Sequence, residues 1–277
     1  MDQNKIINFA RVLSRNTLIG KLKNLYVNQM RSSYRKNRGL FLGKDGVEIG
    51  GPSPIFTENG SIPTYNDANS IDNVNWSSDT FWSKHKNGGA FTIHEGKRLG
   101  KEWVIDSTEF TKDFHERYDF LQCSHVLEHI AGTVKALLSW RSVLKVNGTA
   151  IILVPDKRRT YDVDRPYTTL EHFIEDFNNN IGENDETHFE EIIKLHRLSV
   201  DTSDNINIKS SEDWRDRVLD NANSRIIHQH VFKMEVLSEL LDLCGFKVIA
   251  SERFVPHHIA IIASKTRNKP EILENSK

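Results

Sequence analysis

The feature that most constrains the fold is the run VEIGGPSP at residues 47–54, where an apolar, strand-like stretch ends at two adjacent glycines. Glycine has no Cβ, so the backbone at Gly50 and Gly51 can turn sharply and approach a ligand closely. Glu48 lies two positions before this turn. The pattern predicts a strand that ends in a turn against a nucleotide-like ligand.

Further apolar runs follow this turn at spacings typical of strands joined by crossover connections. The predicted strands cover residues 47–49, 71–74, 103–105, 120–123, 150–154, 246–250 and 259–264, with helices over 134–144 and 234–243. Parallel strands joined in this way form a doubly wound sheet, which binds ligands at the carboxyl ends of its strands. The stretch 51–101 is rich in Gly, Pro, Asn and Ser, so it predicts long loops with little regular helix.

The strand rhythm breaks over residues 156–231, which we interpret as an insertion over an acceptor site. Two Thr-x-x-Glu capping boxes, at 168–171 and 187–190, predict helix starts, and a third short helix is expected near 214–221. The predicted division is an N-terminal helical cover at 1–42, a core at 43–155 and 232–265, the insertion, and a tail at 266–277. The cover, helical over 4–36, has an apolar stripe suited to the core or to a homodimer interface.

Composition argues against several classes of function. Lys and Arg total 37 against 38 Asp and Glu, a net charge of −1 that gives no bulk attraction to nucleic acid. No apolar run approaches the roughly 20 residues that span a bilayer, and the N-terminus lacks the continuous apolar segment of a secretion signal. Cys123 and Cys244 lie in apolar segments, so we expect buried thiols in a cytoplasmic protein.

The order of motifs resembles the class I S-adenosylmethionine (SAM) dependent methyltransferases. A strand-like YDFLQCS leads into HVLEHI over 118–130, and a helix then leads to LKVNGTAIILVPD over 144–156. The last two predicted strands resemble the antiparallel sixth and seventh strands of that family. Over about 45–264 the chain also resembles a narrower bacterial group associated with surface-glycan assembly, through EIGGPSPIF, SIDN, SHVLEHI, VPDKRRTYD, RPYTTLEHFIED, ETHFEEI and RIIHQHVF. The resemblance implies a Rossmann-like core and SAM as the cofactor.

The resemblance also implies which strand ends hold the cofactor. In place of the family's GxGxG, this chain has Gly-Gly-Pro-Ser-Pro. Asp72 lies 24 positions beyond Glu48, near the spacing of a ribose-binding acid, with an Asx-turn as the alternative. Asp106 matches the adenine position, with a helix N-cap as the alternative, and Glu128 and His129 are assigned a mainly structural role. The implied cofactor-binding set is Glu48, Gly50, Gly51, Ser53, Asp72, Asn73, Asp106, Ser107, Ser124 and His125.

The predicted insertion supplies candidates for the acceptor site. A histidine can take a proton from a hydroxyl near neutral pH, and the candidate bases are His228, His230 and His172, with Asp156 as a base or orienting group. Lys157, Arg158, Arg159 and Arg165 form a basic run that either holds an anionic group or is solvated. His188 and His196 fall on the apolar face of one predicted helix and are assigned to the substrate, with buried hydrogen-bonded histidines as the alternative.

Histidine spacing raises a metal site as a further alternative. His188 and Glu191 have i,i+3 spacing, and His228 and His230 alternate along an extended segment. His188 and His196, however, are eight residues apart, about 12 Å along a helix, and cannot share an ion directly. The main interpretation assigns no metal ligand and leaves open whether the histidine-rich insertion holds one.

These patterns predict an α/β, SAM-dependent O-methyltransferase. The expected acceptor is a small molecule or glycan precursor: a sugar, a nucleotide-linked sugar, or a phosphoryl or phosphoramidate group of a capsule or other surface polysaccharide. The alternatives are an NAD-dependent oxidoreductase, a catalytically silent SAM-binding scaffold and a metal-dependent hydrolase. The oxidoreductase would need a regular glycine-rich helix start, which Pro52 and Pro54 disfavour.

Overall fold

The computed structural model describes residues 30–82, 84–93, 97–200 and 210–275. Most of the predicted N-terminal helix, and with it the predicted homodimer surface, lies outside the described residues. The helix α3 (Ser32–Asn37) falls in the last part of that prediction. Its Tyr34 is fully buried and donates a hydrogen bond to Asp67 Oδ2 at 2.6 Å. This end of the predicted cover therefore packs on the core.

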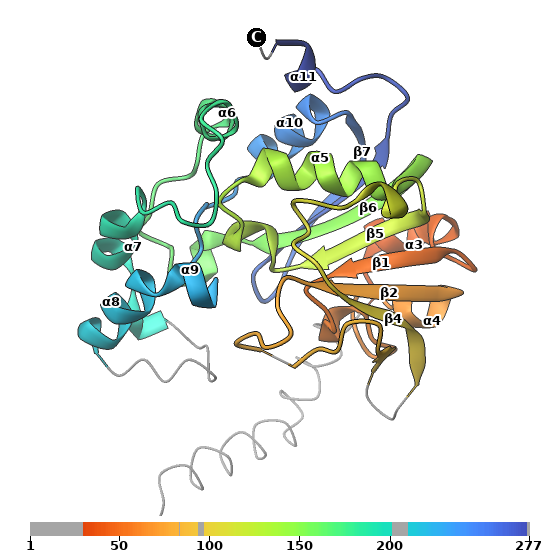
Figure 1. Cartoon of the computed structure of the whole chain (residues 1–277), viewed down its shortest axis with the longest axis horizontal. Coiled ribbons are helices and arrows are strands. Elements are labelled where there is room, and N and C mark those ends of the chain that lie inside the picture. Colours follow the sequence, from red (N-terminus) through yellow and green to blue (C-terminus); the bar gives the residue numbers. More distant parts are fainter. Residues whose placement is uncertain (1–29, 83, 94–96, 201–209, 276–277) are drawn as a thin grey trace, which may run out of the picture.

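A mixed sheet forms the centre of the described molecule (Figure 1), in the order β3-β4-β2-β1-β5-β6-β8-β7. Neighbouring strands from β4 to β6 are parallel, whereas β8 runs antiparallel to both β6 and β7. The predicted doubly wound sheet with an antiparallel C-terminal pair is confirmed. The strands are β1 (Asp45–Ile49), β2 (Ser70–Asn75), β3 (Ala90–Thr92), β4 (Arg98–Val104), β5 (Tyr118–Ser124), β6 (Leu144–Pro155), β7 (Phe246–Phe254) and β8 (His258–Lys265).

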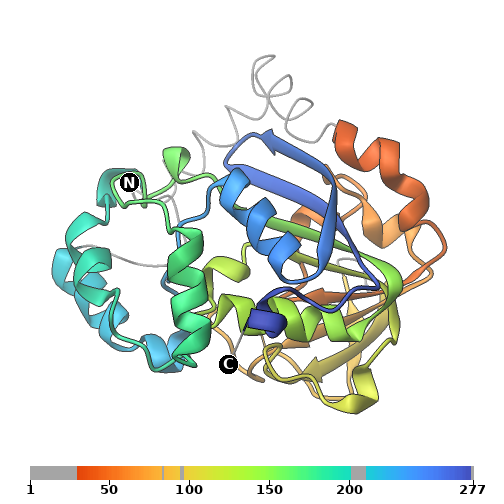
Figure 2. The same cartoon turned by 90° about the horizontal axis from the view of Figure 1, so that it is seen from above.

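Alternation along the strands builds two cores, one on each face of the sheet. On β6, Ile152 and Val154 pack with one face, and Ile151 and Leu153 with the other. The helices α5 (Thr133–Val143) and α10 (Met234–Leu243) cover the first face, and α3 and α4 (Thr64–Asp67) cover the second (Figure 2). The strand order reverses between β1 and β5, the switch point where such sheets bind ligands.

The segment from 156 to 231 lies beyond one end of the sheet (Figures 1 and 2). It contains α6 (Leu170–Asn178), α7 (Phe189–Leu195), α8 (Ser211–Leu219) and α9 (Asn221–Ser224). A small apolar core of its own joins α7, α8 and the strand-like chain after α9: Phe189, Ile192, Trp214, Val218, Ile226 and Ile227. We call this part of the chain the 156–231 segment.

Both predicted capping boxes are wrong in detail. The N-cap of α6 is Thr169, whose side chain accepts from His172 N–H, because Thr168 Oγ1 is engaged by Val231 N–H at 3.0 Å. The helix α7 begins one residue after His188, and Thr187 Oγ1 donates to Asp185 Oδ2 at 2.6 Å rather than capping the helix. Long-range and turn contacts thus displaced both local patterns.

The stretch after β1 contains little regular helix, as expected. The glycine turn leads into a single 3-10 turn, η2 (Pro54–Phe56), and then to the short α4. Cys123 and Cys244 are buried free thiols. Within the described residues, no helix has the length and apolar character that crossing a bilayer requires.

Candidate functional site

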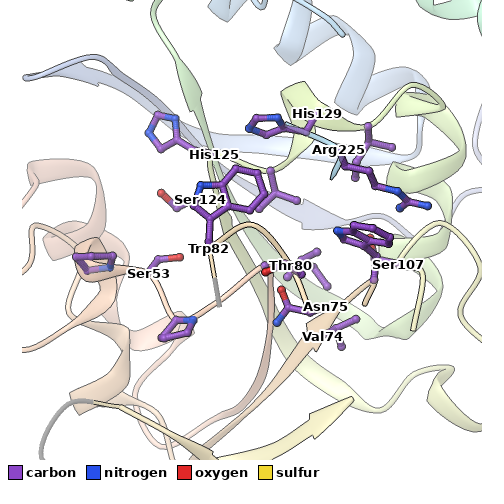
Figure 3. Close-up of a pocket in the computed structure, with 17 residues that line it drawn as sticks. Ser53, Val74, Asn75, Thr80, Trp82, Ser107, Ser124, His125, His129 and Arg225 are labelled. Atoms are coloured by element: carbon purple, nitrogen blue, oxygen red, sulfur yellow. The ribbon is translucent and has the colours of Figure 1, made fainter. Parts of the chain in front are cut away.

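A cavity of about 320 Å³ opens at the carboxyl ends of the parallel strands, beside the switch point. Figure 3 shows His125, His129 and Arg225 along one side and Ser53, Thr80 and Asn75 along the other. Strand ends supply most of the wall, and Arg225 is the contribution of the 156–231 segment. The lining residues are Ile49, Gly50, Pro52, Ser53, Pro54, Val74, Asn75, Trp76, Thr80, Trp82, Ser107, Ser124, His125, Val126, His129, Ile130 and Arg225.

The glycine turn forms one wall and tolerates no side chain. Gly50 adopts φ +76°, and a methyl group on it would lie 2.5 Å from Val126 Cγ2. A methyl group on Gly51 would lie 2.5 Å from Glu48 Cδ and 2.8 Å from Asn73 Oδ1. At this turn only glycine fits, because the Cβ of any other residue would clash with these neighbours.

Glu48 and Asn73 support this turn from beneath and are not among the lining residues. The Asn73 amide brackets Gly51, accepting from its N–H at 3.0 Å and donating to its carbonyl at 3.1 Å. The Glu48 carboxylate, fully buried, accepts from Tyr65 Oη at 2.6 Å and from Gln122 Nε2 at 3.2 Å. Burial raises the pKa of Glu48 to about 7.

At β2, the predicted ribose acid Asp72 lies away from the cavity. Its carboxylate accepts from Trp103 Nε1 at 3.0 Å, from Tyr118 Oη at 2.9 Å and from Lys101 N–H at 2.9 Å. The polar side chain at the cavity is Asn75, the last residue of β2, and Trp76 follows it. Sequence reasoning missed both residues, because it looked for an acid at a set spacing from Glu48. The signal that could have found them was their position at the end of the strand.

Beyond β4, Ser107 lines the cavity, whereas Asp106 next to it forms local and long-range contacts. Asp106 Oδ1 accepts from Thr108 N–H at 2.9 Å, and Oδ2 pairs with Arg225 Nη2 at 2.8 Å. Burial alone would raise the pKa of Asp106, but the Thr108 N–H and the Arg225 charge hold it below its ordinary value. The Arg225 guanidinium also lies 4.4 Å from the centre of the Trp76 ring.

At the end of β5, Ser124 and His125 line the cavity, and their assignment to the cofactor stays a prediction. His125 adopts φ +56°, an uncommon conformation for a residue with a side chain. Its Nδ1 lies 3.3 Å from Glu128 Oε1, and its Nε2 lies 2.8 Å from His258 Nδ1. His129, assigned a structural role from sequence, also lines the cavity.

Glu128 is a fully buried carboxylate behind this wall: its Oε1 pairs with His125 Nδ1 at 3.3 Å, whereas its Oε2 has no hydrogen-bond partner among the described residues. Burial alone would raise its pKa, yet His125, His129 and His228 together hold the pKa of Glu128 below its usual value. An ionised, poorly satisfied carboxylate close to a cavity favours a cationic ligand there.

Among the histidines of the 156–231 segment, His228 is oriented by a carboxylate. Its Nδ1 donates to Asp162 Oδ2 at 2.5 Å, so its Nε2 points elsewhere, 4.0 Å from Glu128 Oε1. The rings of His228 and His129 meet edge to face, with centres 4.7 Å apart. Burial alone would lower the pKa of His228, but the Asp162 carboxylate raises it. His228 thus sits directly behind the cavity wall that His129 forms.

The predicted anion-binding residues are engaged within the protein. Arg165 is buried and bonds Asp162 at 2.9 Å, Glu191 at 2.8 Å and the carbonyls of His228 and Gln229. Asp156 pairs with Arg158, whose hydrogen bonds lower the pKa of that carboxylate. Lys157 Nζ lies 4.3 Å from the centre of the Tyr167 ring. None of these side chains lines the cavity, so their assignment to the acceptor stays a prediction.

The remaining predicted histidines lie in two other places. His196 stacks on Trp214, with ring centres 3.9 Å apart, beside Tyr161. His172, His188 and His230 converge on Asp176 between α6 and α7. The expected pairing of His172 with Asp176 is present, at 3.3 Å. Sequence reasoning placed these three histidines singly and did not bring them together.

Comparison with known proteins gives structural likeness at low identity. No model of a known protein family matches the sequence, and no curated protein matches it. Solved structures that resemble this one include a methyltransferase from Mesorhizobium loti (TM-score 0.46, 11% identity, covering 84% of this chain and 96% of that one). Another is a SAM-dependent methyltransferase from Methanosarcina mazei, with a TM-score of 0.45 and 13% identity; the match covers 87% of this chain and 100% of that one. A third is the Burkholderia thailandensis 1,6-didemethyltoxoflavin-N1-methyltransferase, with bound S-adenosylhomocysteine (0.44, 13%, 94% and 89%). Each describes what this chain is similar to in fold.

Proposed function

We propose that this chain is a SAM-dependent methyltransferase whose cofactor occupies the cavity beside the glycine turn. The observation that carries the proposal is the set of groups at four strand ends: bare backbone at Gly50, polar side chains at Asn75, Ser107 and Ser124, and the aromatic ring of Trp76. Nucleoside ligands of doubly wound sheets bind at this edge. The ionised Glu128 behind the wall matches a sulfonium cation better than an anionic dinucleotide.

Within this proposal, each wall has a part. Asn75 and Trp76 both line the cavity; Asn75 would contact the ribose, and the Trp76 ring would stack on the adenine. Ser53 and Ser124 stand near the turn where the amino acid end would lie. An NAD-dependent reaction is disfavoured, because η2 replaces the regular helix that would receive a pyrophosphate.

We assign proton removal to His228. The cofactor would supply an electrophilic methyl group. As the acceptor oxygen takes up that methyl group, its proton would pass to His228 Nε2. Asp162 holds the ring through Nδ1 and stabilises the imidazolium that forms. Since His228 lies behind His129, the acceptor would enter from the side of the 156–231 segment.

The acceptor class rests on sequence resemblance. We expect an oxygen of a sugar, nucleotide-linked sugar or related capsule precursor, methylated in the cytoplasm. The test is calorimetry with SAM, S-adenosylhomocysteine and NAD, followed by transfer of labelled methyl to precursor extracts. SAM binding without transfer to any precursor would favour a silent scaffold, and NAD binding alone would overturn the proposal.

A sharper test of the cavity uses Trp76. If its ring stacks on adenine, Trp76→Ala weakens SAM binding by roughly 1–3 kcal/mol, or about fivefold to 150-fold, whereas Trp76→Phe retains most of the affinity. The measurement is the SAM dissociation constant of both variants by calorimetry. Equal affinity in the wild type and Trp76→Ala would remove the ring from the cofactor site.

A further inference from the structure

Four ligand-type side chains converge in the 156–231 segment, in a cluster separate from the residues that line the cavity. His172 and Asp176 come from successive turns of α6, His188 precedes α7, and His230 lies on the chain that leads to α10. Each can offer one nitrogen or oxygen, and these atoms all lie within 4.8 Å of one another. We call these residues the histidine cluster.

Three of the six separations between ligand atoms of the histidine cluster are close to the edge length of a tetrahedron around a metal ion, and the other three are within 4.8 Å. His172 Nε2 lies 3.1 Å from His188 Nε2 and 3.3 Å from Asp176 Oδ2, and His230 Nε2 lies 3.0 Å from the same Oδ2. Zinc binds imidazole nitrogen and carboxylate oxygen at about 2.0–2.2 Å, which places tetrahedral ligand atoms roughly 3.3 Å apart. These three separations are therefore close to those expected between two ligand atoms of one zinc ion.

The hydrogen bonds around His230 direct its lone pair into the cluster. Thr133 Oγ1 donates its single proton to Ile130 O at 3.1 Å, so it accepts from His230 Nδ1, also at 3.1 Å. In the neutral ring, Nε2 is then an acceptor that faces another acceptor, Asp176 Oδ2. A cation between them removes this conflict, and such an outer hydrogen bond is typical of metal-bound histidine.

We propose that the histidine cluster is a structural Zn²⁺ site, bound by His172, Asp176, His188 and His230. Four protein ligands complete a tetrahedral shell, which is the pattern of structural rather than catalytic zinc. Imidazole with one carboxylate is a donor set suited to zinc among the first-row metals. The site goes beyond methyl transfer and does not depend on it.

The four proposed ligands carry one formal negative charge when the three imidazoles are neutral. Asp176 supplies the negative charge within the shell, and Arg165 and Asp185 are the charged groups that act on His188 from outside. Neutral nitrogens with one carboxylate form a shell that retains one positive charge when zinc is bound.

A zinc ion here would join parts of the chain that are far apart in sequence. It would tie α6 to the start of α7 and to the residues before α10, and Thr133 links the site to the first turn of α5. The apolar core shared by α7 and α8 is small. Metal binding would therefore supply stability that this core lacks.

The experiment is metal analysis of the purified full-length protein, then Zn²⁺ titration after chelation. We expect about one zinc per chain, and a lower melting temperature after chelation that zinc restores. His172→Ala should weaken zinc binding by roughly 100-fold or more. That side chain is about one-third exposed (34%), so its loss does not open the core. The matched control is His115→Ala, at an exposed histidine outside the cluster.

Two further measurements keep the proposal testable if one variant folds poorly. His172→Cys keeps a zinc ligand and should retain binding, and cobalt in the wild type should give the strong visible absorption of a tetrahedral site. A wild type that binds zinc no more tightly than His172→Ala, with no effect of chelator on melting, would overturn the proposal. Those results would favour histidines that only hydrogen-bond to one another. None of these measurements involves SAM, so failure of the methyltransferase proposal would leave them unchanged.

Discussion

The cavity and the 156–231 segment are held by different forces. The cavity lies at the ends of buried strands, where backbone, apolar and aromatic side chains and a few polar groups face the ligand space. The residues behind it in the 156–231 segment are held by charge pairs and ring contacts, such as Asp162 with His228 and Arg165 with Glu191. Under the proposed function, the cofactor would bind on the sheet, and the proton transfer would take place beside it in the 156–231 segment.

This contrast also separates the effects of substitution. A change in the strand ends should act on cofactor affinity, whereas a change in the 156–231 segment should act on turnover. Arg225 is the exception, since it belongs to that segment and contacts both Trp76 and Asp106. Variants in each region therefore test this distinction.

The largest effect is expected for His228→Gln. Removing a positioned base lowers turnover by roughly 10²–10⁴-fold, while SAM affinity stays near that of the wild type because His228 does not line the cavity. Steady-state kinetics and SAM calorimetry on the same preparation give both quantities. His115→Gln, at an exposed site, serves as the control. A parallel loss of affinity and turnover would mean that the two regions are not separable.

A smaller effect, on stability, is expected for Glu48 beneath the glycine turn. Its folded-state pKa of about 7 lies above the ordinary 4.5, because burial disfavours the charged form. The stability it contributes is therefore present below about pH 4.5 and is lost as pH rises through 7. Glu48→Gln mimics the protonated acid, so its free energy of unfolding relative to wild type should rise by about 3 kcal/mol from pH 4.5 to 8.

Denaturant unfolding across that pH range measures the difference for Glu48→Gln. The exposed Glu58→Gln is the control, and its difference from wild type should stay flat. A flat difference for Glu48→Gln as well would mean that Glu48 is already ionised throughout.

How much the sequence could predict differs between these same regions. The glycine turn, the helix α5 and the strands other than β3 depend on local alternation and on residues such as Gly50, so local patterns predicted them. The short strand β3 (Ala90–Thr92) was missed, because it lies in a stretch whose composition predicted loops. Ser124 and His125 reach the cavity for the same reason, because Ser124 ends β5 and His125 follows it, and Ser107 lies three residues beyond the end of β4. Asp72 shows the limit of a prediction from spacing. It lies three residues before Asn75 on β2, and that difference places its side chain away from the cavity that Asn75 lines.

The histidine cluster could not be predicted in this way. His172 and Asp176 are neighbours on one helix, and this contact was expected from sequence. His230 is 58 residues beyond His172, and only the packing of α6 against the chain before α10 brings their rings together, with centres 5.8 Å apart. Local patterns contain no information on such contacts, and the same holds for the displaced cap at Thr168.

The smallest effect is expected at Arg225, where the two regions meet. Its guanidinium side chain is 18% exposed and that of Asp106 is 31% exposed, so solvent screens their pairing. Arg225→Ala removes both this pairing and the contact with the Trp76 ring, so the free energy of SAM binding should weaken by about 1 kcal/mol. We expect SAM affinity to fall by about fivefold, with a similar modest fall in turnover, because this side chain serves both regions.

A double-mutant cycle with Asp106→Asn separates the ion pair from the ring contact. If the pairing with Asp106 carries the effect, the double variant should lose little more SAM affinity than Arg225→Ala alone. If the ring contact with Trp76 carries the effect, the losses of SAM affinity in the two single variants should add in the double variant. Arg225→Lys should then bind SAM almost as weakly as Arg225→Ala, since lysine lacks the planar group that lies over the indole. Unchanged affinity in Arg225→Ala would show that the 156–231 segment does not contribute to cofactor binding, which would make the division between the two regions complete.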